Sequence, residues 1–300
     1  MQAHEHRSEL GAWRSAHRAA DPRLRPFVSG YFASTSTLPR PVHERLLPSA
    51  EVPLLLNFGA PHWRLDSAGT TVWTCRDGAW VVGLHDRPQL SEAVGERDFM
   101  VVGFTPLGAH HFLRAPMDLI RGEAADLSAL DAKLAAQVMS RAGVARGWNA
   151  RFDAMEALIA ERVADATRPG GFVAAWRRLE AADGRLPIGA LAAQADCSHR
   201  VLIEQFRTYA GVTPKAAGRL FRFNRAARSL DALGPGRGAQ NRGMPYIETS
   251  AEGAARLGAV PWADVAADCG YADQAHFIKE FRQFAGTTPG AFLRRMADVG

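Results

Sequence analysis

The chain is poor in cysteine and has no long apolar run. Its three cysteines, Cys75, Cys197 and Cys269, are odd in number and widely spaced, which argues against a disulfide framework and against a four-cysteine zinc site. The longest apolar runs, such as Val52–Leu56, are far shorter than the ~20 residues that cross a bilayer. Residues 1–20 carry charges throughout and lack the apolar core of a secretory signal. These absences predict a cytoplasmic protein without a membrane partner.

Lysine is also scarce, since only Lys133, Lys215 and Lys279 stand among 36 basic residues. The basic excess is placed unevenly along the chain. Residues 1–171 hold 19 basic and 19 acidic residues, whereas residues 172–300 hold 17 and 12. The formal net charge of +5 therefore lies entirely in the C-terminal part. A localised excess of this kind is typical of a nucleic-acid-binding domain, although charge alone is a weak signal.

The length of 300 residues favours two domains, at roughly 100–200 residues each. Residues 22–26 open the first ordered region that the sequence predicts. Short segments rich in Val, Leu, Phe and Trp then indicate an antiparallel sandwich or barrel, and from about residue 107 the apolar spacing becomes helical. The strands are predicted at 52–58, 71–75, 80–84 and 99–104, the helices at 127–139 and 150–163, and a linker at 168–171.

The most informative feature is an internal repeat in the C-terminal part. Residues 191–220 and 265–295 align at an offset of 75 residues from the turn onward. The second copy has one extra residue in its turn. Two copies with matched aromatic, glycine and Thr-Pro positions are strong evidence for a duplicated structural unit. The matched positions are Phe206 and Phe281, Ala210 and Ala285, Gly211 and Gly286, and Thr213-Pro214 and Thr288-Pro289.

Each copy predicts a short Ala-rich helix, a tight turn and a second helix. Ser198 and Asp273 are suited to cap the second helices, because their side chains accept hydrogen bonds from free N–H groups of the first turn. Glycine ends each second helix, and Thr-Pro begins the helix that follows. The predicted first helices are 188–194 and 262–268, and the predicted second helices are 198–209 and 273–284.

The second helices are amphipathic. Leu202 and Phe206 share one face of the first copy, as Phe277 and Phe281 do in the second, and these faces are expected to be buried. The opposite faces are polar and basic, which suits a helix that enters the major groove of duplex DNA. The predicted DNA-contacting residues are Ser198, His199, Arg200, Ile203, Glu204, Arg207, Gln274, Ala275, His276, Lys279 and Arg282.

Residues 187–296 resemble the DNA-binding domain of AraC-type transcription regulators. The resemblance rests on Leu191-Ala192, Ser198-x-Arg200-x-Leu202, Phe206, Gly211 and Pro214, and on Val265-Ala266, Gly270-Tyr271-x-Asp273-Gln274-x-His276-Phe277, Phe281-Arg282, Gly286 and Thr288-Pro289. It implies an α+β protein: a β-rich N-terminal sensing or dimerisation domain with trailing helices over 1–168, then an all-α domain over 169–300.

In that all-α domain, the resemblance implies two helix-turn-helix units, 187–211 and 262–286, joined by one long helix over 214–233. Residues 220, 223, 227 and 230 of that helix are expected to face inward. The arginines at 219, 222, 225 and 228 cannot share one surface at 3.6 residues per turn, so one or two are expected near phosphate and the others in salt bridges. The N-terminal segments 21–32, 46–59 and 103–114 look like those of a subgroup of such regulators.

The implied function is sequence-specific binding of double-stranded DNA by two recognition helices in successive major grooves. The resemblance leaves open a small-molecule effector, a homodimer and contact with RNA polymerase. Two departures stand out. Glu204 replaces a residue that is commonly basic, and a carboxylate there repels phosphate while accepting from cytosine N4. Residues 234–259 form a longer Gly-rich stretch than usual, which predicts a surface loop; a phosphate- or partner-binding element is the minority interpretation.

Two other functions stay open at this stage: an enzyme that a regulator-like tail tethers to DNA, and a non-specific architectural DNA binder. The chain has no Gly-x-Ser-x-Gly or phosphate-binding loop, so it predicts no catalytic residues, no enzyme activity and no cofactor. The histidines of the N-terminal half lack the spacing of metal ligands, so no metal site is predicted; they are His43, His62, His85, His110 and His111.

Overall fold

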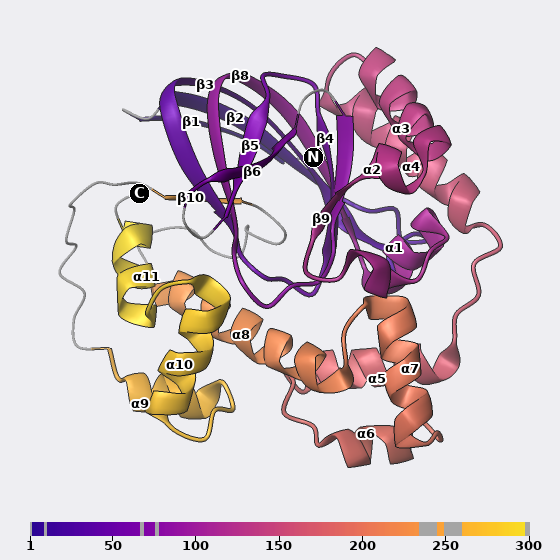
Figure 1. Ribbon diagram of the computed structural model, residues 1–300, viewed down its shortest axis with the longest axis vertical. Coiled ribbons are helices and arrows are strands. Elements are labelled where there is room, and N and C mark those ends of the chain that lie inside the picture. Colours follow the sequence, from indigo (N-terminus) through magenta and orange to yellow (C-terminus); the bar gives the residue numbers. More distant parts are fainter. Residues whose placement is uncertain are drawn as a thin grey trace.

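The fold is given by a computed structural model that describes residues 2–8, 11–66, 69–75, 78–233, 245–248 and 260–297. An antiparallel sheet with its own helices forms the N-terminal part, and the remaining helices lie along one end of that sheet (Figure 1). The predicted α+β class is therefore confirmed. No described helix is long and apolar enough to cross a membrane.

The sheet follows the order β1-β2-β3-β8-β4-β7-β9, and β5 and β6 form a hairpin that joins β8. All four predicted strand segments lie in strands of this sheet. The strand bounds are β1 Gln2–Ser8, β2 Gly11–Ala19, β3 Val28–Leu46, β4 Val52–Asn57, β5 His62–Leu65, β6 Thr71–Cys75, β7 Gly78–Val82, β8 Gln89–Phe104 and β9 Ala124–Asp126.

The prediction that order begins at residue 22 is wrong, because β1 and β2 precede it. Both strands are rich in His, Arg, Ala and Ser, and apart from Trp13 they lack the Val, Ile, Phe, Tyr and Trp residues that mark a strand in sequence. Their pairing supplies the missing signal: Ala16 of β2 lies opposite Ala33 of β3 and is fully buried. Tertiary context rather than local preference makes these two strands.

Strands β3 and β8 are the longest strands, and they run from one end of the sheet to the other. They pair from Val28 with Phe104 to Leu46 with Gln89, with an irregularity between Leu38 and Val42. That interruption falls at Leu-Pro-Arg-Pro, where proline lacks the N–H needed for the ladder. Beyond it, alternate residues of β3 point to opposite sides of the sheet.

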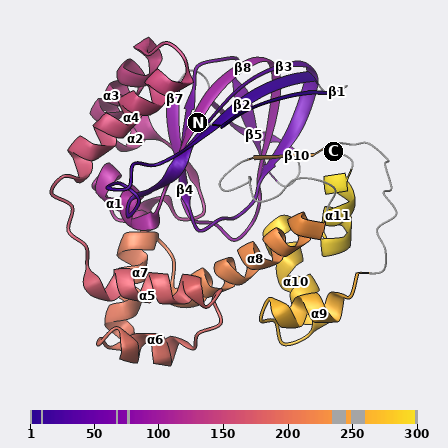
Figure 2. The same ribbon diagram turned by 180° about the vertical axis from the view of Figure 1, so that it is seen from behind.

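Helices α3 and α4 flank the sheet on the side away from β1 (Figure 2). The helix predicted over 127–139 is two helices, because Asp131 interrupts it: its extended backbone ends α2, and its carboxylate accepts from the Leu134 N–H to begin α3. The bounds are α1 Pro106–Leu113, the short 3-10 helix η1 Met117–Ile120, α2 Leu127–Leu130, α3 Ala132–Val144 and α4 Trp148–Val163.

The helices after the 168–171 break are close to prediction. The bounds are α5 Gly170–Ala181, α6 Ile188–Gln194, α7 His199–Ala210, α8 Pro214–Leu233, α9 Trp262–Asp268, α10 Gln274–Ala285 and α11 Pro289–Ala297. In α8 the expected inward residues Leu220, Phe223 and Leu230 are buried. Caps and Thr-Pro starts are local signals, which explains the agreement.

The stretch 234–259 is described only at β10, Pro245–Glu248, so most of the predicted loop lies outside the described residues. The described part is not loop: β10 pairs antiparallel with β3, from Pro245 opposite Leu46 to Glu248 opposite His43. The unpaired edge of β3 at this point explains why a Gly-rich insertion becomes a strand there.

Candidate DNA interface

The first helix-turn-helix unit consists of α6, a turn at 195–198 and α7. Asp196 takes a left-handed backbone conformation in the turn, and the Ser198 hydroxyl accepts from the Val201 N–H at 3.3 Å, which caps α7. The apolar face of α7 is buried through Leu202 and Phe206, with Phe206 against Phe172 and Trp176 of α5. The polar face is therefore turned outward.

The second unit repeats this design with α9, a turn at 269–273 and α10. The Asp273 carboxylate accepts from the His276 N–H at 2.7 Å, and Gly270 takes the left-handed conformation that Asp196 takes in the first turn. Phe277 and Phe281 are buried, and Phe281 packs on Phe223 of α8 with ring centroids 5.3 Å apart. Burial of this face fixes which side chains of α10 reach solvent.

The structure brings the predicted contact residues onto the outer faces of α7 and α10. Ser198, His199, Arg200, Glu204 and Arg207 are exposed in the first unit, and Ile203 is half-buried. In the second unit all five predicted residues are exposed: Gln274, Ala275, His276, Lys279 and Arg282. Because exposure leaves these groups open to a partner, the geometry permits both helices to meet the major groove.

The two faces differ in charge. On α7, Arg200 Nε donates to Glu204 Oε1 at 3.2 Å, so the carboxylate already engages one of the two arginines of this face. On α10, Lys279 and Arg282 have no ion-pair partner among the described residues. An exposed pair contributes only ~0–1 kcal/mol, yet it offsets a positive charge that phosphate would otherwise meet. The second unit thus carries the stronger positive face.

All four arginines of α8 form ion pairs in this structure. Arg219 and Arg222 pair with Glu280 at 2.8 and 3.4 Å, while Arg225 and Arg228 pair with Asp183 at 2.5 and 3.5 Å. The expected salt bridges are therefore present, and contact of one or two of these arginines with phosphate stays a prediction. Sequence spacing showed that they diverge around the helix, but it could not show Asp183 or Glu280 opposite them.

Sequence reasoning also missed how the second unit meets the N-terminal domain. Arg45 of β3 donates to the Ala285 carbonyl at 2.9 Å, at the C-terminal end of α10 where the helix dipole favours a cation. Asn224 of α8 accepts from the Ala50 N–H at 3.1 Å and donates to the Pro48 carbonyl at 2.7 Å. These partners lie more than 170 residues apart, so no local pattern signals them.

The first unit meets the same domain through apolar and backbone packing. Gly211, which ends α7, lies so close to η1 that a Cβ would stand 2.5 Å from the Met117 carbonyl oxygen. The His110 ring of α1 contacts the Tyr209 ring edge-on at 4.8 Å. Burial lowers the pKa of His110, and the adjacent His111 lowers it further. Both recognition helices thus rest on the N-terminal domain by their C-terminal ends and point their N-terminal ends away (Figure 1).

A cavity lies inside the N-terminal sheet, on the face opposite the packed helices. Its walls are mostly apolar, with Leu55, Trp80 and Phe99 among them. One wall is ionic: Arg97 donates to both carboxylate oxygens of Glu44, at 2.6 and 3.1 Å, and both side chains are less than a tenth exposed. Sequence reasoning did not find this pair, because its members lie on different strands across the irregularity in β3.

The N-terminal histidines do not gather into a metal centre. Across the described ranges, no group of three or more His, Cys, Asp or Glu side chains could hold a metal ion. His85 is buried and makes a 2.9 Å contact from Nδ1 to the Gly83 carbonyl, and burial lowers its pKa. Cys269 is fully buried in the second turn, and burial raises the pKa of its thiol. Cys197, by contrast, is only half-buried.

Two known families match parts of the chain. Residues 249–295 match a family of helix-turn-helix domains, and residues 16–126 match a domain of unknown function. No curated protein matches the chain.

Among solved structures, ToxT from Vibrio cholerae is 8% identical, with a TM-score of 0.46, over 89% of this chain and 98% of that one. A mutant of Bacillus subtilis oxalate decarboxylase is 15% identical, with a TM-score of 0.23, over 34% of this chain and 27% of that one. The 7S globulin of Momordica charantia is 11% identical, with a TM-score of 0.25, over 34% and 32%.

The two capped helix pairs are helix-turn-helix units, and the second of them lies within the matched helix-turn-helix domain. The helix-turn-helix part of the resemblance found in the sequence is confirmed over residues 249–295.

Proposed function

We propose that the protein is an AraC-type transcription regulator. It binds a specific duplex sequence with α7 and α10 in two successive major grooves on one face of the DNA. The observation that carries this proposal is the duplication itself, since two capped helices with buried aromatic faces expose their polar faces from one shared scaffold. Grooves on one face recur every ~34 Å, so the site would consist of two half-sites one helical turn apart. Phosphate contacts would supply much of the affinity and make it depend on salt.

The experiment is selection of bound duplexes from a random pool with the full chain, followed by hydroxyl-radical footprinting. Two protected segments about 10 base pairs apart are the expected result. Equal affinity for selected and random duplexes would instead indicate a non-specific architectural binder. A single protected segment would assign base recognition to one unit alone.

We further propose that the N-terminal domain responds to a small-molecule effector and acts by binding rather than by catalysis. The cavity inside the sheet supports this proposal, because ligand sites are mostly apolar with a few placed polar groups. Its charged lining residues are Glu44, Arg64 and Arg97, which leaves one excess positive charge on the lining. Arg64 Nη1 pairs with exposed Glu123 at 3.3 Å, but the buried Nε of Arg64 has no hydrogen-bond partner. A compact carboxylic acid with an apolar body fits these groups.

Thermal-shift titration with benzoate and octanoate tests the effector site. Arg64→Gln should abolish the shift that either acid causes, while Arg87→Gln, which removes an exposed cation outside the cavity, should retain it. Equal shifts in both variants would place the acid elsewhere. The homodimer and the contact with RNA polymerase are separate expectations, which sedimentation and transcription in vitro test.

A further inference from the structure

Glu280 occupies an unusual place for a carboxylate on a recognition helix. It lies on the side of α10 that faces α8, and only 6% of its surface is exposed. The corresponding residue of the first unit is Gln205, which carries no charge. A buried carboxylate needs hydrogen-bonded cationic partners to offset the loss of water. Its partners therefore show what it holds in place.

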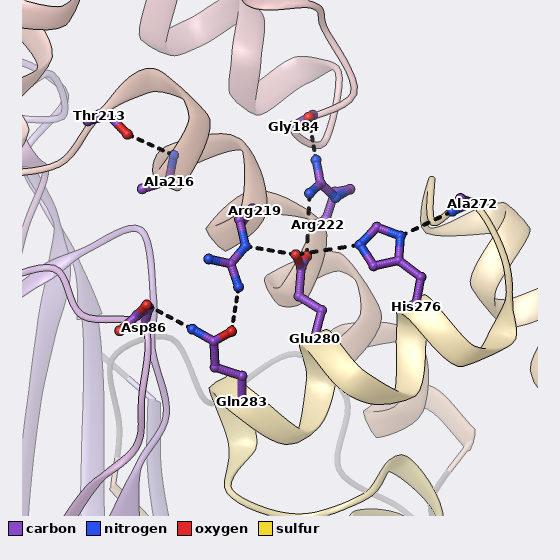
Figure 3. Close-up of polar contacts among 10 residues, drawn as sticks. All are labelled: Asp86, Gly184, Thr213, Ala216, Arg219, Arg222, Ala272, His276, Glu280 and Gln283. Atoms are coloured by element: carbon purple, nitrogen blue, oxygen red, sulfur yellow. Dashed lines mark hydrogen bonds and ion pairs between the residues drawn. The ribbon is translucent and has the colours of Figure 1, made fainter.

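Two arginines of α8 supply those partners. Arg219 Nε donates to Glu280 Oε2 at 2.8 Å, and Arg222 Nη2 donates to Oε1 at 3.4 Å (Figure 3). Arg222 Nη1 also donates to the Gly184 carbonyl at 3.1 Å. Gly184 belongs to the loop that leads from α5 into α6, where a Cβ would stand 1.9 Å from the Gly218 carbonyl oxygen of α8. One guanidinium thus joins the loop that precedes the first unit to the second recognition helix.

The side chains around Glu280 also contact the N-terminal domain. Arg219 Nη2 donates to Gln283 Oε1 at 2.7 Å, and Gln283 Nε2 donates to Asp86 Oδ2 at 2.9 Å (Figure 3). Asp86 precedes β8 by only a few residues, and the first residue of β8, Gln89, lines the cavity inside the sheet. The segment that holds Gln283 therefore continues into the proposed effector site.

The cluster also touches the outer face of α10. His276, a predicted DNA contact, has its Nε2 3.8 Å from Glu280 Oε2, and its ring meets Tyr271 edge-on. We define the Glu280 cluster as Glu280, Arg219, Arg222 and Gln283. Two residues of α10, Glu280 and Gln283, belong to this cluster. Through the cluster, α10 is connected to the long helix α8, to the loop before the first unit and to the N-terminal domain.

Apolar packing alone would not fix the direction in which α10 points. Phe223 stacks on Phe284 at 5.0 Å and contacts Phe281, which attaches α10 to α8. Hydrophobic contact is non-directional, whereas charge-assisted hydrogen bonds constrain geometry. Removal of the cluster should therefore leave the helix attached but less precisely oriented.

We propose that Glu280 is the positioning residue that orients the second recognition helix relative to the first unit, and so sets the half-site spacing that the regulator accepts. Asp86 gives the N-terminal domain its hold on this cluster, which is where an effector would act on spacing. The proposal rests on the proposed two-groove function, and it assigns the control of spacing to named side chains.

The test measures affinity for a selected duplex and for duplexes with one, two or three base pairs inserted between the half-sites. Each inserted pair shifts a half-site along the axis and rotates it by ~34–36°. Wild type should lose ~10-fold or more over the series. Glu280→Gln should bind the original spacing ~5–10-fold more weakly and show a flattened series, because a loosely held unit loses preorganisation but tolerates misplacement. Affinity for a single half-site should not change.

Asp264→Asn is the matched control, since it removes one carboxylate from exposed α9 of the same unit. It should follow wild type at every spacing. If Glu280→Gln fails to fold, Arg222→Met provides the same test, because methionine keeps an apolar stem of similar length but has no N–H to donate to Gly184 or Glu280. Asp86→Ala should flatten the series to a smaller degree, and a wild-type profile there would remove the N-terminal domain from the cluster.

Two results would overturn the role of Glu280. One is a Glu280→Gln series parallel to wild type; the other is an equal loss on the single half-site, which would make Glu280 a support for α10 alone. Failure of the two-groove function looks different, because wild type itself would then select no paired half-sites.

Discussion

The positive face of α10 allows the effect of removing it to be calculated. Lys279 and Arg282 are exposed and have no ion-pair partner in the described structure, so their replacement by alanine breaks no salt bridge. Each phosphate contact contributes ~0.9 to the slope of log affinity against log salt, so the double variant should lower that slope by ~2. At ~1–3 kcal/mol for each good contact, the two losses sum to ~2–6 kcal/mol, so affinity should fall ~30-fold or more.

The assay is fluorescence anisotropy with a selected duplex between about 50 and 200 mM salt. A matched control removes Lys133 of α3 and Arg146 of the loop after it, two exposed cations of the N-terminal domain, and should leave slope and affinity unchanged. Circular dichroism should show the same helix content in both double variants. An unchanged slope for the Lys279→Ala/Arg282→Ala variant would show that this face of α10 does not contact phosphate, because the loss of two phosphate contacts must lower the slope.

Three further outcomes are expected. Glu204→Gln should tighten binding to random duplex several-fold by freeing Arg200, and selection should show altered preference at one base pair; anisotropy with no gain would mean that the carboxylate does not face DNA. Glu44→Gln should lower the free energy of unfolding by ~3–5 kcal/mol, because it leaves Arg97 charged and buried; urea unfolding within about 1 kcal/mol of wild type would contradict this. Because the folded pKa of His110 is lowered, stability is lost as the pH falls below the unfolded value of 6.5. The amide protection factors at the end of α7, which correct for the intrinsic exchange rate at each pH, should therefore be lower at about pH 5.5 than at about pH 7.5, and His110→Phe should remove that difference.

The C-terminal helices were predictable because their signals are local. Ser198 and Asp273 cap the second helices, and Pro214 begins the long one, each within a few residues of the structure it creates. The repeat showed the same capping and Thr-Pro signals a second time, at matched positions. Exposed and buried faces then followed from helical spacing alone.

The parts that were missed depend on residues far apart in sequence. Arg97 pairs with Glu44, which lies 53 positions away in sequence, and Arg219 pairs with Glu280, which lies 61 positions away. The carboxylate partners of the α8 arginines also come from other elements, so the sequence did not show which ion pairs these arginines form. Strands β1 and β2 were missed for the same reason, since their pairing partners rather than their own residues make them strands.

The most direct test of the account is footprinting of a selected duplex by the full-length wild type and by the Lys279→Ala/Arg282→Ala variant. The account predicts two protected segments about one helical turn apart for wild type, with one of the two weakened selectively in the variant. Protection that is uniform along random DNA, or that weakens equally in both segments, would contradict a regulator that reads two half-sites with two separate helices.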